Sequence, residues 1–148
     1  MARTTLSALQ AAIAAAIEAD AWFVDIPVIQ DVGTQCDNEA RERALSAVGI
    51  CITVFPVEDF WRQGGSRGTN LVKASFFVWV EENPNQNQLA HNRSALEASA
   101  RVISIVTSYD SGPGELRPET EDRAGTLLIS SDGVRVHELP FTKIVQLF

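Results

Sequence analysis

Residues 71–85 read LVKASFFVWVEENPN, and a helical pattern follows this segment to about Val106. In residues 71–80 the even-numbered side chains are mostly apolar, and the odd-numbered ones include Phe77 and Trp79. Side chains alternate between the two faces of a strand, so both faces of this one are suited to burial. Such a pattern is typical of the centre of a sheet. The sequence therefore predicts a central strand here, with the rest of the chain as its covers and edges.

The segment after this strand is expected to turn and then form a helix. Glu81-Glu82 closes the strand in this interpretation, and Asn83-Pro84-Asn85 turns the chain. Ser94 and Glu97 have the spacing of a capping box, so the firm part of the helix should begin near Ser94. The predicted apolar stripe consists of Leu89, Leu96, Ala100, Ile103 and Val106, widened by Val102 and Ile105.

Composition indicates one soluble domain spanning residues 1–148. The chain is 45% hydrophobic, carries a net charge of −7 and has a pI of about 4.7. That charge argues against non-specific nucleic-acid binding, which needs Lys and Arg to neutralise phosphates. No apolar run approaches the ~20 residues of a membrane span, and residues 1–21 are a poor match to a signal peptide. No membrane partner is expected.

The first third of the chain predicts a helix and two strands. Residues 4–19 should form a helix on a sheet, with one face in solvent and one stripe made of Leu6, Leu9, Ile13 and Ile17. Residues 22–32 predict a strand that Pro27 places at an edge or bends. Residues 33–43 predict a loop or short helical turn. Residues 44–57 predict a strand covered on both faces.

Residues 56–70 predict a long connection between two strands, with Phe60, Trp61, Arg62 and Arg67 in it. Two interpretations stay open for the aromatic side chains. They fold back on the core, or they dock on a partner, since aromatic residues and Arg dominate interface hot spots. We assign the four residues as a candidate interface loop.

The chain shows no recognisable catalytic, cofactor or metal motif. Cys36 and Cys51 lack metal-ligand spacing, so buried free thiols are favoured and a disulfide stays open. The acidic segment 110–122 would be a solvated loop or, alternatively, a divalent-metal or acid/base site. His91 and His137 have no acid or nucleophile at a readable spacing and are interpreted as ordinary polar residues.

The C-terminal third predicts a hairpin. Residues 126–131 and 134–139 flank Asp132-Gly133, a dipeptide typical of a two-residue type I′ turn. Pro140 should break the second strand, and residues 141–148 should resume an extended apolar ending.

The element order predicts an α+β fold. Strand pairs joined by loops favour a mainly antiparallel sheet, with two helices packed on one face and long projecting loops. A rigid sheet with projecting loops and no readable site chemistry suits a binding or assembly protein better than an enzyme.

Several segments resemble tailed-phage tail proteins. They are the Ala-rich first helix, Ile26-Pro27-Val28, Val54-Phe55-Pro56 with the following loop, the helix from Asn92 to Val106, and the ending from Val134 to Phe141. The similarity is greatest to the tail terminators and related minor tail proteins. It covers most of the chain in element order and length and carries no catalytic residues.

The resemblance implies a structural virion protein without cofactors. Members of this group form a ring, typically a hexamer, that caps the tail tube and joins it to the head–tail connector. DNA would pass through without specific binding, and assembly would take place in the host cytoplasm. Alternatives are a neck or head-completion protein, a ligand- or metal-binding domain that uses residues 110–122, and a host-encoded interaction domain.

Overall fold

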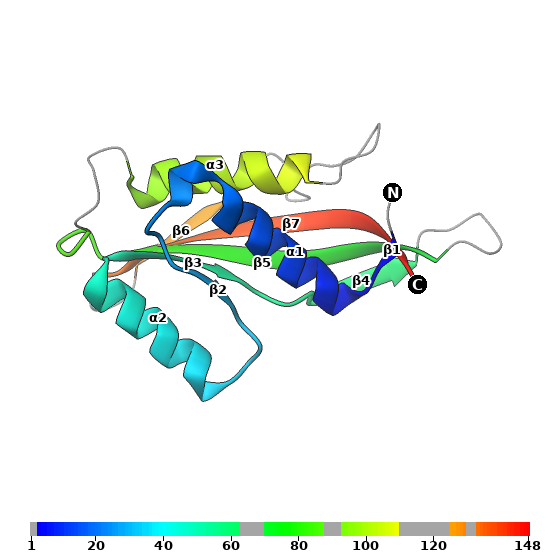
Figure 1. The fold of residues 1–148 in the computed structure, drawn as a ribbon, viewed down its shortest axis with the longest axis horizontal. Helices are drawn as coiled ribbons and strands as arrows, with labels where there is room; N and C mark the ends of the chain where they lie inside the picture. Colours follow the sequence, from blue (N-terminus) through cyan, green and yellow to red (C-terminus); the bar gives the residue numbers. More distant parts are fainter. Residues whose placement is uncertain (1–2, 63–69, 88–92, 110–124, 130–132) are drawn as a thin grey trace.

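The computed structural model describes residues 3–62, 70–87, 93–109, 125–129 and 133–148, which form three α-helices, one 3-10 helix and a seven-stranded sheet (Figure 1). In chain order the elements are β1 (Arg3–Thr4), α1 (Leu6–Ala19), η1 (Ala21–Phe23), β2 (Val28–Gln30), α2 (Gln35–Ala47), β3 (Ile50–Val54), β4 (Asp59–Arg62), β5 (Leu71–Glu82), α3 (Ala95–Ser108), β6 (Thr126–Ile129) and β7 (Arg135–Leu147).

The predicted α+β class is confirmed, with β5 at the centre of the sheet. The strand order is β1-β7-β5-β3-β2, while β4 also pairs with β5 and β6 with β7. β5 pairs antiparallel with β7 along its whole length. The sheet is mixed rather than purely antiparallel, because β1 runs parallel to β7 and β2 runs parallel to β3.

Helices cover both faces of the sheet, but unequally. α1 and α3 lie side by side over one face, as predicted, and we call it the helix face (Figure 1). α2 packs near β2 and β3 on the opposite face, which we call the open face. Its Arg41 lies against Phe55 and Trp79, whose side chains point away from the main core. The prediction of two helices missed α2.

The main core lies between the helix face and α1 and α3. The side chains of β5 on this face are all buried, as the alternation predicts: Val72, Ala74, Phe76, Val78 and Val80. Phe76 stacks on Phe141 of β7, with ring centroids 5.7 Å apart. α1 contributes the predicted buried residues Leu9, Ile13 and Ile17. Its first turn is capped by Thr5, whose hydroxyl accepts from the Ala8 amide at 3.1 Å.

The predicted strand over residues 22–32 is wrong for most of its length. Ala21–Phe23 is a 3-10 helix, Asp25 has a positive φ of 67°, and only Val28–Gln30 is extended. The short polar capping residue Asp20 accepts from the Trp22 amide at 2.9 Å and starts this turn. The predicted edge position is confirmed, because β2 pairs only with β3 among the described strands.

Residues 35–43 form most of helix α2, which continues through Ala47, so the predicted loop is wrong and the alternative of a short helical turn is correct in type but too short. Only Ala44 of this helix is fully buried, so the sequence has almost no apolar periodicity to reveal it. The Asp37 carboxylate accepts from the Thr34 and Val32 amides at 2.9 and 3.0 Å and caps the first turn. Gly49, with a φ of 91°, separates α2 from β3, so the predicted strand begins at Ile50 rather than Ala44.

β5 does not end before Glu81 but continues through Glu82, and both carboxyl side chains are buried.

Helix α3 begins at Ala95 as predicted, and its cap Ser94 accepts from the Glu97 amide at 3.3 Å. The predicted stripe is confirmed for Val102 and Val106, which are buried, and for Ile103 and Ile105, which pack against the core. It is wrong for Ala100 and for Leu96, which is 66% exposed, and it missed the buried residues Ala95, Ala98 and Ser99. Small side chains at 95, 98 and 99 let the helix approach the sheet closely.

The C-terminal hairpin forms, but not with the predicted two-residue turn. That turn would pair Ile129 with Val136, whereas the structure pairs Ile129 with Arg135. The pairing therefore places an odd number of residues in the loop, which a type I′ turn does not allow. Gly133 has a φ of 84° and provides the left-handed residue, while residues 130–132 lie outside the described part.

Pro140 does not interrupt β7, contrary to the prediction. β6 pairs with Arg135–Glu138 and β1 with Gln146–Leu147 on one side of this strand. Between them, no described strand lies on that side at Pro140. An imino nitrogen that faces an open edge removes no ladder hydrogen bond, so the strand continues.

Candidate functional site

The predicted interface residues lie on a strand rather than in an unpaired loop. Phe60, Trp61 and Arg62 belong to β4, which pairs antiparallel with residues 72–75 of β5. Arg67 lies outside the described residues. We call Phe60, Trp61 and Arg62 the β4 patch. Sequence reasoning missed β4 because its four residues, Asp59–Arg62, include two charges and no alternation.

The β4 patch exposes both of its aromatic side chains. Phe60 is 58% and Trp61 49% exposed, so neither folds back on the core. Phe60 pairs with Ala74 and shares its helix-face side, whereas Trp61 pairs with Lys73 on the open face. Two large aromatics in water at one edge strand mark a surface that is suited to a partner.

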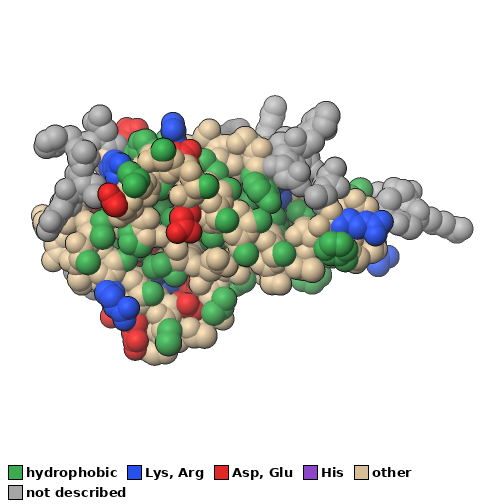
Figure 2. Space-filling model, in the orientation of Figure 1, with side chains coloured by type: hydrophobic (Ala, Val, Ile, Leu, Met, Phe, Trp, Pro, Cys, Tyr) green, Lys and Arg blue, Asp and Glu red, His purple; other side chains and the backbone are tan. Residues whose placement is uncertain are grey.

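Basic side chains accompany this patch at one end of the sheet. Arg62 pairs with Val72, and Lys73 is the next residue of β5. Arg3 of β1 lies at the same end, since β1 and the start of β5 both pair with the last residues of β7. On the face drawn in Figure 2, Lys and Arg side chains are visible at the β4 end, whereas acidic and basic side chains are mixed over the other half. β4 itself also carries the exposed Asp59.

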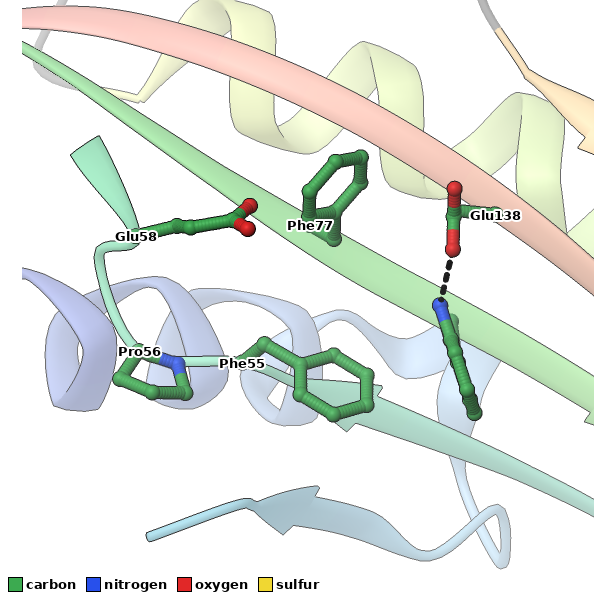
Figure 3. Close-up of a pocket in the computed structure, with 6 residues that line it drawn as sticks. Phe55, Pro56, Glu58, Phe77 and Glu138 are labelled. Carbon is green, nitrogen blue, oxygen red and sulfur yellow. Dashed lines mark hydrogen bonds between the residues drawn. The ribbon is translucent and has the colours of Figure 1, made fainter. Parts of the chain in front are cut away.

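The open face carries a shallow groove of ≈ 260 Å³, which we call the aromatic groove. In Figure 3 the rings of Phe55 and Phe77 stand out from the sheet, and the Glu58 and Glu138 carboxylates flank them on opposite sides. Among the described residues, it is lined by Phe55, Pro56, Glu58, Phe77, Trp79 and Glu138. The groove therefore combines an apolar floor with two acidic sides.

Packing and hydrogen bonding hold the floor of the groove in place. The Trp79 and Phe55 rings meet edge to face with centroids 4.8 Å apart. Trp79 Nε1 donates to Glu138 Oε2 at 2.9 Å, which orients both side chains (Figure 3). The Glu58 carboxylate is exposed, and no hydrogen bond or ion pair is described for it. Glu58 is consequently accessible to a partner at this side of the groove.

Arg41 of α2 supports the same aromatic pair at the β3 end. Its guanidinium lies 5.8 Å from the Phe55 ring centroid and 6.0 Å from that of Trp79. Arg41 Nη1 is 2.5 Å from Asp31 Oδ2, and Nε is 3.7 Å from Glu81 Oε1. Sequence reasoning had no signal for this cluster, because its members come from α2, the end of β2, β3 and β5.

Burial raises the pKa of the Glu81 carboxyl above its ordinary value, while the Arg41 charge opposes the rise. Asp37, on the solvent side of α2, has a lowered pKa because its carboxylate accepts the Thr34 and Val32 amides. These two shifts belong to the packing and capping of α2 and indicate no proton-transfer site.

Lys143 has a structural role at the end of α3. It is buried on β7, and its ammonium group donates to the Val106 carbonyl oxygen at 3.1 Å and to that of Tyr109. Helix C-termini favour such a cation, and α3 has no basic residue in its own last turn. The depression around Lys143, lined also by Arg3 and Tyr109, is therefore explained by helix capping.

The remaining candidate residues make no catalytic or metal constellation in the described ranges. No group of three potential metal ligands occurs there. His137 is half-buried, and burial lowers its pKa. Cys51 is buried and free, whereas Cys36 is exposed and free, so the expectation of buried thiols is wrong for Cys36. His91 and the acidic segment 110–122 lie outside the described residues.

No family model and no curated protein matches this chain. Among the described helices, none is long and apolar enough to cross a membrane.

Proposed function

We propose that this chain is a structural, non-enzymatic tail terminator of a tailed phage or prophage. It assembles into a ring, a hexamer by analogy with the group it resembles. The ring caps the tail tube in the host cytoplasm, stays in the virion and presents a surface to the head–tail connector. The proposal begins from the resemblance in sequence and element order.

The observation that carries the proposal is the exposure of the β4 patch beside the aromatic groove. Phe60 and Trp61 are each about half exposed, and the groove rings lie on a different part of the same sheet. A chain that exposes two distinct recognition surfaces can bind a neighbour with each of them. Assembly proteins need this arrangement, whereas a monomeric binding domain needs only one surface.

The charge of the chain is compatible with a DNA channel. Each copy carries a net charge of −7, so a ring of six copies has a strongly acidic body. DNA that passes an acidic wall is repelled from it and is not retained. Specific DNA binding has no part in this proposal.

Two measurements test the proposal. Light scattering after size-exclusion chromatography, over a range of concentrations, should detect a discrete mass near six subunits. Added to polymerising tail tube protein, the chain should stop tube growth and remain at one end of the tube. Unaltered tube length together with a monomeric mass at every concentration would contradict the proposal.

The neck-protein alternative predicts the same ring but a different binding partner. Such a protein would join the portal side of the head and leave tube growth unaffected. A discrete ring that binds purified portal complexes and does not arrest tubes would favour this alternative over the terminator.

A further inference from the structure

We infer that the β4 patch of one copy docks into the aromatic groove of the next copy, and that this contact builds the ring. The inference rests on the proposed function and specifies the partner of each surface. The occupant of the groove is therefore a second copy of this chain, bound through Phe60, Trp61 and Arg62.

The chemistry of the two surfaces is complementary. The groove offers the rings of Phe55 and Phe77 between two carboxylates, as Figure 3 shows. The β4 edge offers the Trp61 ring on its open-face side and the Phe60 ring and Arg62 guanidinium on its helix-face side, so a groove that receives this edge meets aromatic rings and a cation for its carboxylates. Arginine binds a carboxylate in a bidentate manner and also stacks on aromatic faces, so one side chain can satisfy both parts of the groove.

The patch of a given copy cannot reach its own groove. Trp61 pairs with Lys73, while Phe77, which lines the groove, lies four residues farther along the same strand. At ~3.3 Å per residue, this separation is roughly 13 Å along a rigid, paired strand. The two surfaces are thus both available, and each needs a partner from another molecule.

Electrostatics favours a patch-to-groove contact over a groove-to-groove contact. Two β4 strands placed antiparallel would set Arg62 of one copy against Asp59 of the other, so the symmetric patch contact is the alternative that the single variants below test. Two grooves placed together would oppose Glu58 and Glu138 of both copies. Patch against groove joins different surfaces with opposite charge, and such heterologous contacts close into rings when the rotation between subunits permits.

Charge reversal with rescue tests the contact. Arg62→Glu and Glu58→Arg each place like charges across the junction, so each should raise the concentration needed for half-assembly by at least about tenfold. The double variant Arg62→Glu/Glu58→Arg reverses both sides and should restore assembly. Light scattering across a concentration series measures all three proteins.

Matched controls come from exposed charges on α2. Arg43→Glu and Glu42→Arg make the same charge changes on a surface that the inference leaves free, and both should assemble as the wild type does. Both test residues are also exposed, and circular dichroism with thermal melting should show folded proteins throughout.

A mixing experiment strengthens the test. The Arg62→Glu chain keeps an intact groove, and the Glu58→Arg chain keeps an intact patch. If they alternate around a ring, every junction is complementary, so the mixture should assemble although neither chain does so alone. A symmetric patch-to-patch contact would also join opposite charges in this mixture, but it leaves Glu58 outside the junction, so the Glu58→Arg chain would then assemble alone.

The outcomes separate this inference from the proposed function. If rings persist in both single variants, the inference is overturned while the terminator proposal stands. The inference is also overturned if the single variants lose assembly and neither the double variant nor the mixture restores it. It is likewise overturned if the single variants form rings but no longer arrest tubes, because that result would place the patch against the tube. A wild-type chain that stays monomeric both in solution and on tubes overturns the inference and the proposed function together.

Discussion

β3 and β4 pair with the same edge of β5, yet their surroundings are opposite. All five residues of β3 are buried, whereas all four residues of β4 are exposed. β3 lies under α1 on one face and near α2 on the other, while β4 lies beyond the helices at the end of the sheet (Figure 1). Strand pairing satisfies the backbone in both cases, but only a second layer removes side chains from water.

This difference divides β5 into two functional parts. Beside the C-terminal half of β5 the neighbouring strand β3 belongs to the core, whereas beside the N-terminal half the neighbouring strand β4 is exposed, although Val72, Ala74 and Phe76 of β5 itself stay buried. Mutations in β3 and its supports should therefore change the free energy of unfolding. Mutations in β4 should change assembly and leave stability nearly unaltered.

The largest effect is expected for Ile52→Ala in the middle of β3. Ile52 is fully buried in the main core, so the substitution leaves a cavity and should lower the free energy of unfolding by roughly 2–5 kcal/mol. Urea denaturation monitored by circular dichroism measures this loss. A change below about 1 kcal/mol would show that β3 is less tightly packed than its burial indicates.

Gly49→Ala should have the next largest effect, because Gly49 joins α2 to β3. Its φ of 91° disfavours a side chain, and an added Cβ would lie 2.4 Å from backbone atoms of Gln86 and Asn87. Strain alone costs roughly 1–3 kcal/mol, and the displaced backbone adds to it. Gly33→Ala is the matched control, since its φ is 83° but nothing lies within 4 Å. Equal losses in thermal melts of the two variants would contradict the steric argument.

Arg41→Met should lower the free energy of unfolding by roughly 1–3 kcal/mol, because Arg41 anchors α2 to the open face of the sheet. The change keeps much of the apolar stem but leaves Asp31 and Glu81 without their cation. The Arg41 side chain is still 15% exposed, so the loss stays below that of a fully buried pair. Arg43→Met on the same helix serves as the control and should alter stability by less than about 0.5 kcal/mol in the same denaturation experiment.

The pH dependence of stability should reveal the raised pKa of Glu81. Burial raises its folded-state pKa above the ordinary value of 4.5. A raised pKa contributes stability that is complete below the unfolded-state value and is lost as pH rises through the folded-state value. Glu81→Gln lacks this loss, so its stability relative to wild type should increase from about pH 4 toward neutral pH. Melts of both proteins across this range measure the difference, and a constant or decreasing difference would refute the assignment.

The smallest effect on stability is expected for Phe60→Ala and Trp61→Ala in β4. Both side chains are about half exposed, so each change should alter the free energy of unfolding by about 0.5 kcal/mol or less. Assembly measured by light scattering should nevertheless be impaired. A clear loss of stability in either variant would place these rings in the core and remove the contrast between β3 and β4.

Local pattern was sufficient for the elements whose own residues carry the signal. The apolar alternation of β5 correctly predicted a central strand and its core-facing side chains. The stripe of α1 correctly predicted Leu9, Ile13 and Ile17 as core, and Ser94 correctly marked the start of α3. These features depend on periodicity or capping within a few residues, and such local patterns can be read from the sequence.

Features that depend on distant contacts were predicted incorrectly or not at all. In the first turns of α3 the predicted core residue Leu96 is exposed, and the small residues Ala95, Ala98 and Ser99 are buried instead. Pro140 was taken as a strand end because the open edge beside it is visible only when β1 and β6 are in place. The aromatic groove and the Arg41 cluster were missed since their residues come from separate elements.

The sequence by itself determined the α+β class, the central strand, the first helix, the cap of the third helix and the presence of a C-terminal hairpin. Tertiary structure alone decided that residues 35–47 form a helix, that β4 continues the sheet, and that Phe55, Phe77 and Glu138 meet in one groove. The physical reason is that periodicity records which side of an element is apolar, whereas a surface is made by whichever elements the sheet brings together and the helices leave uncovered.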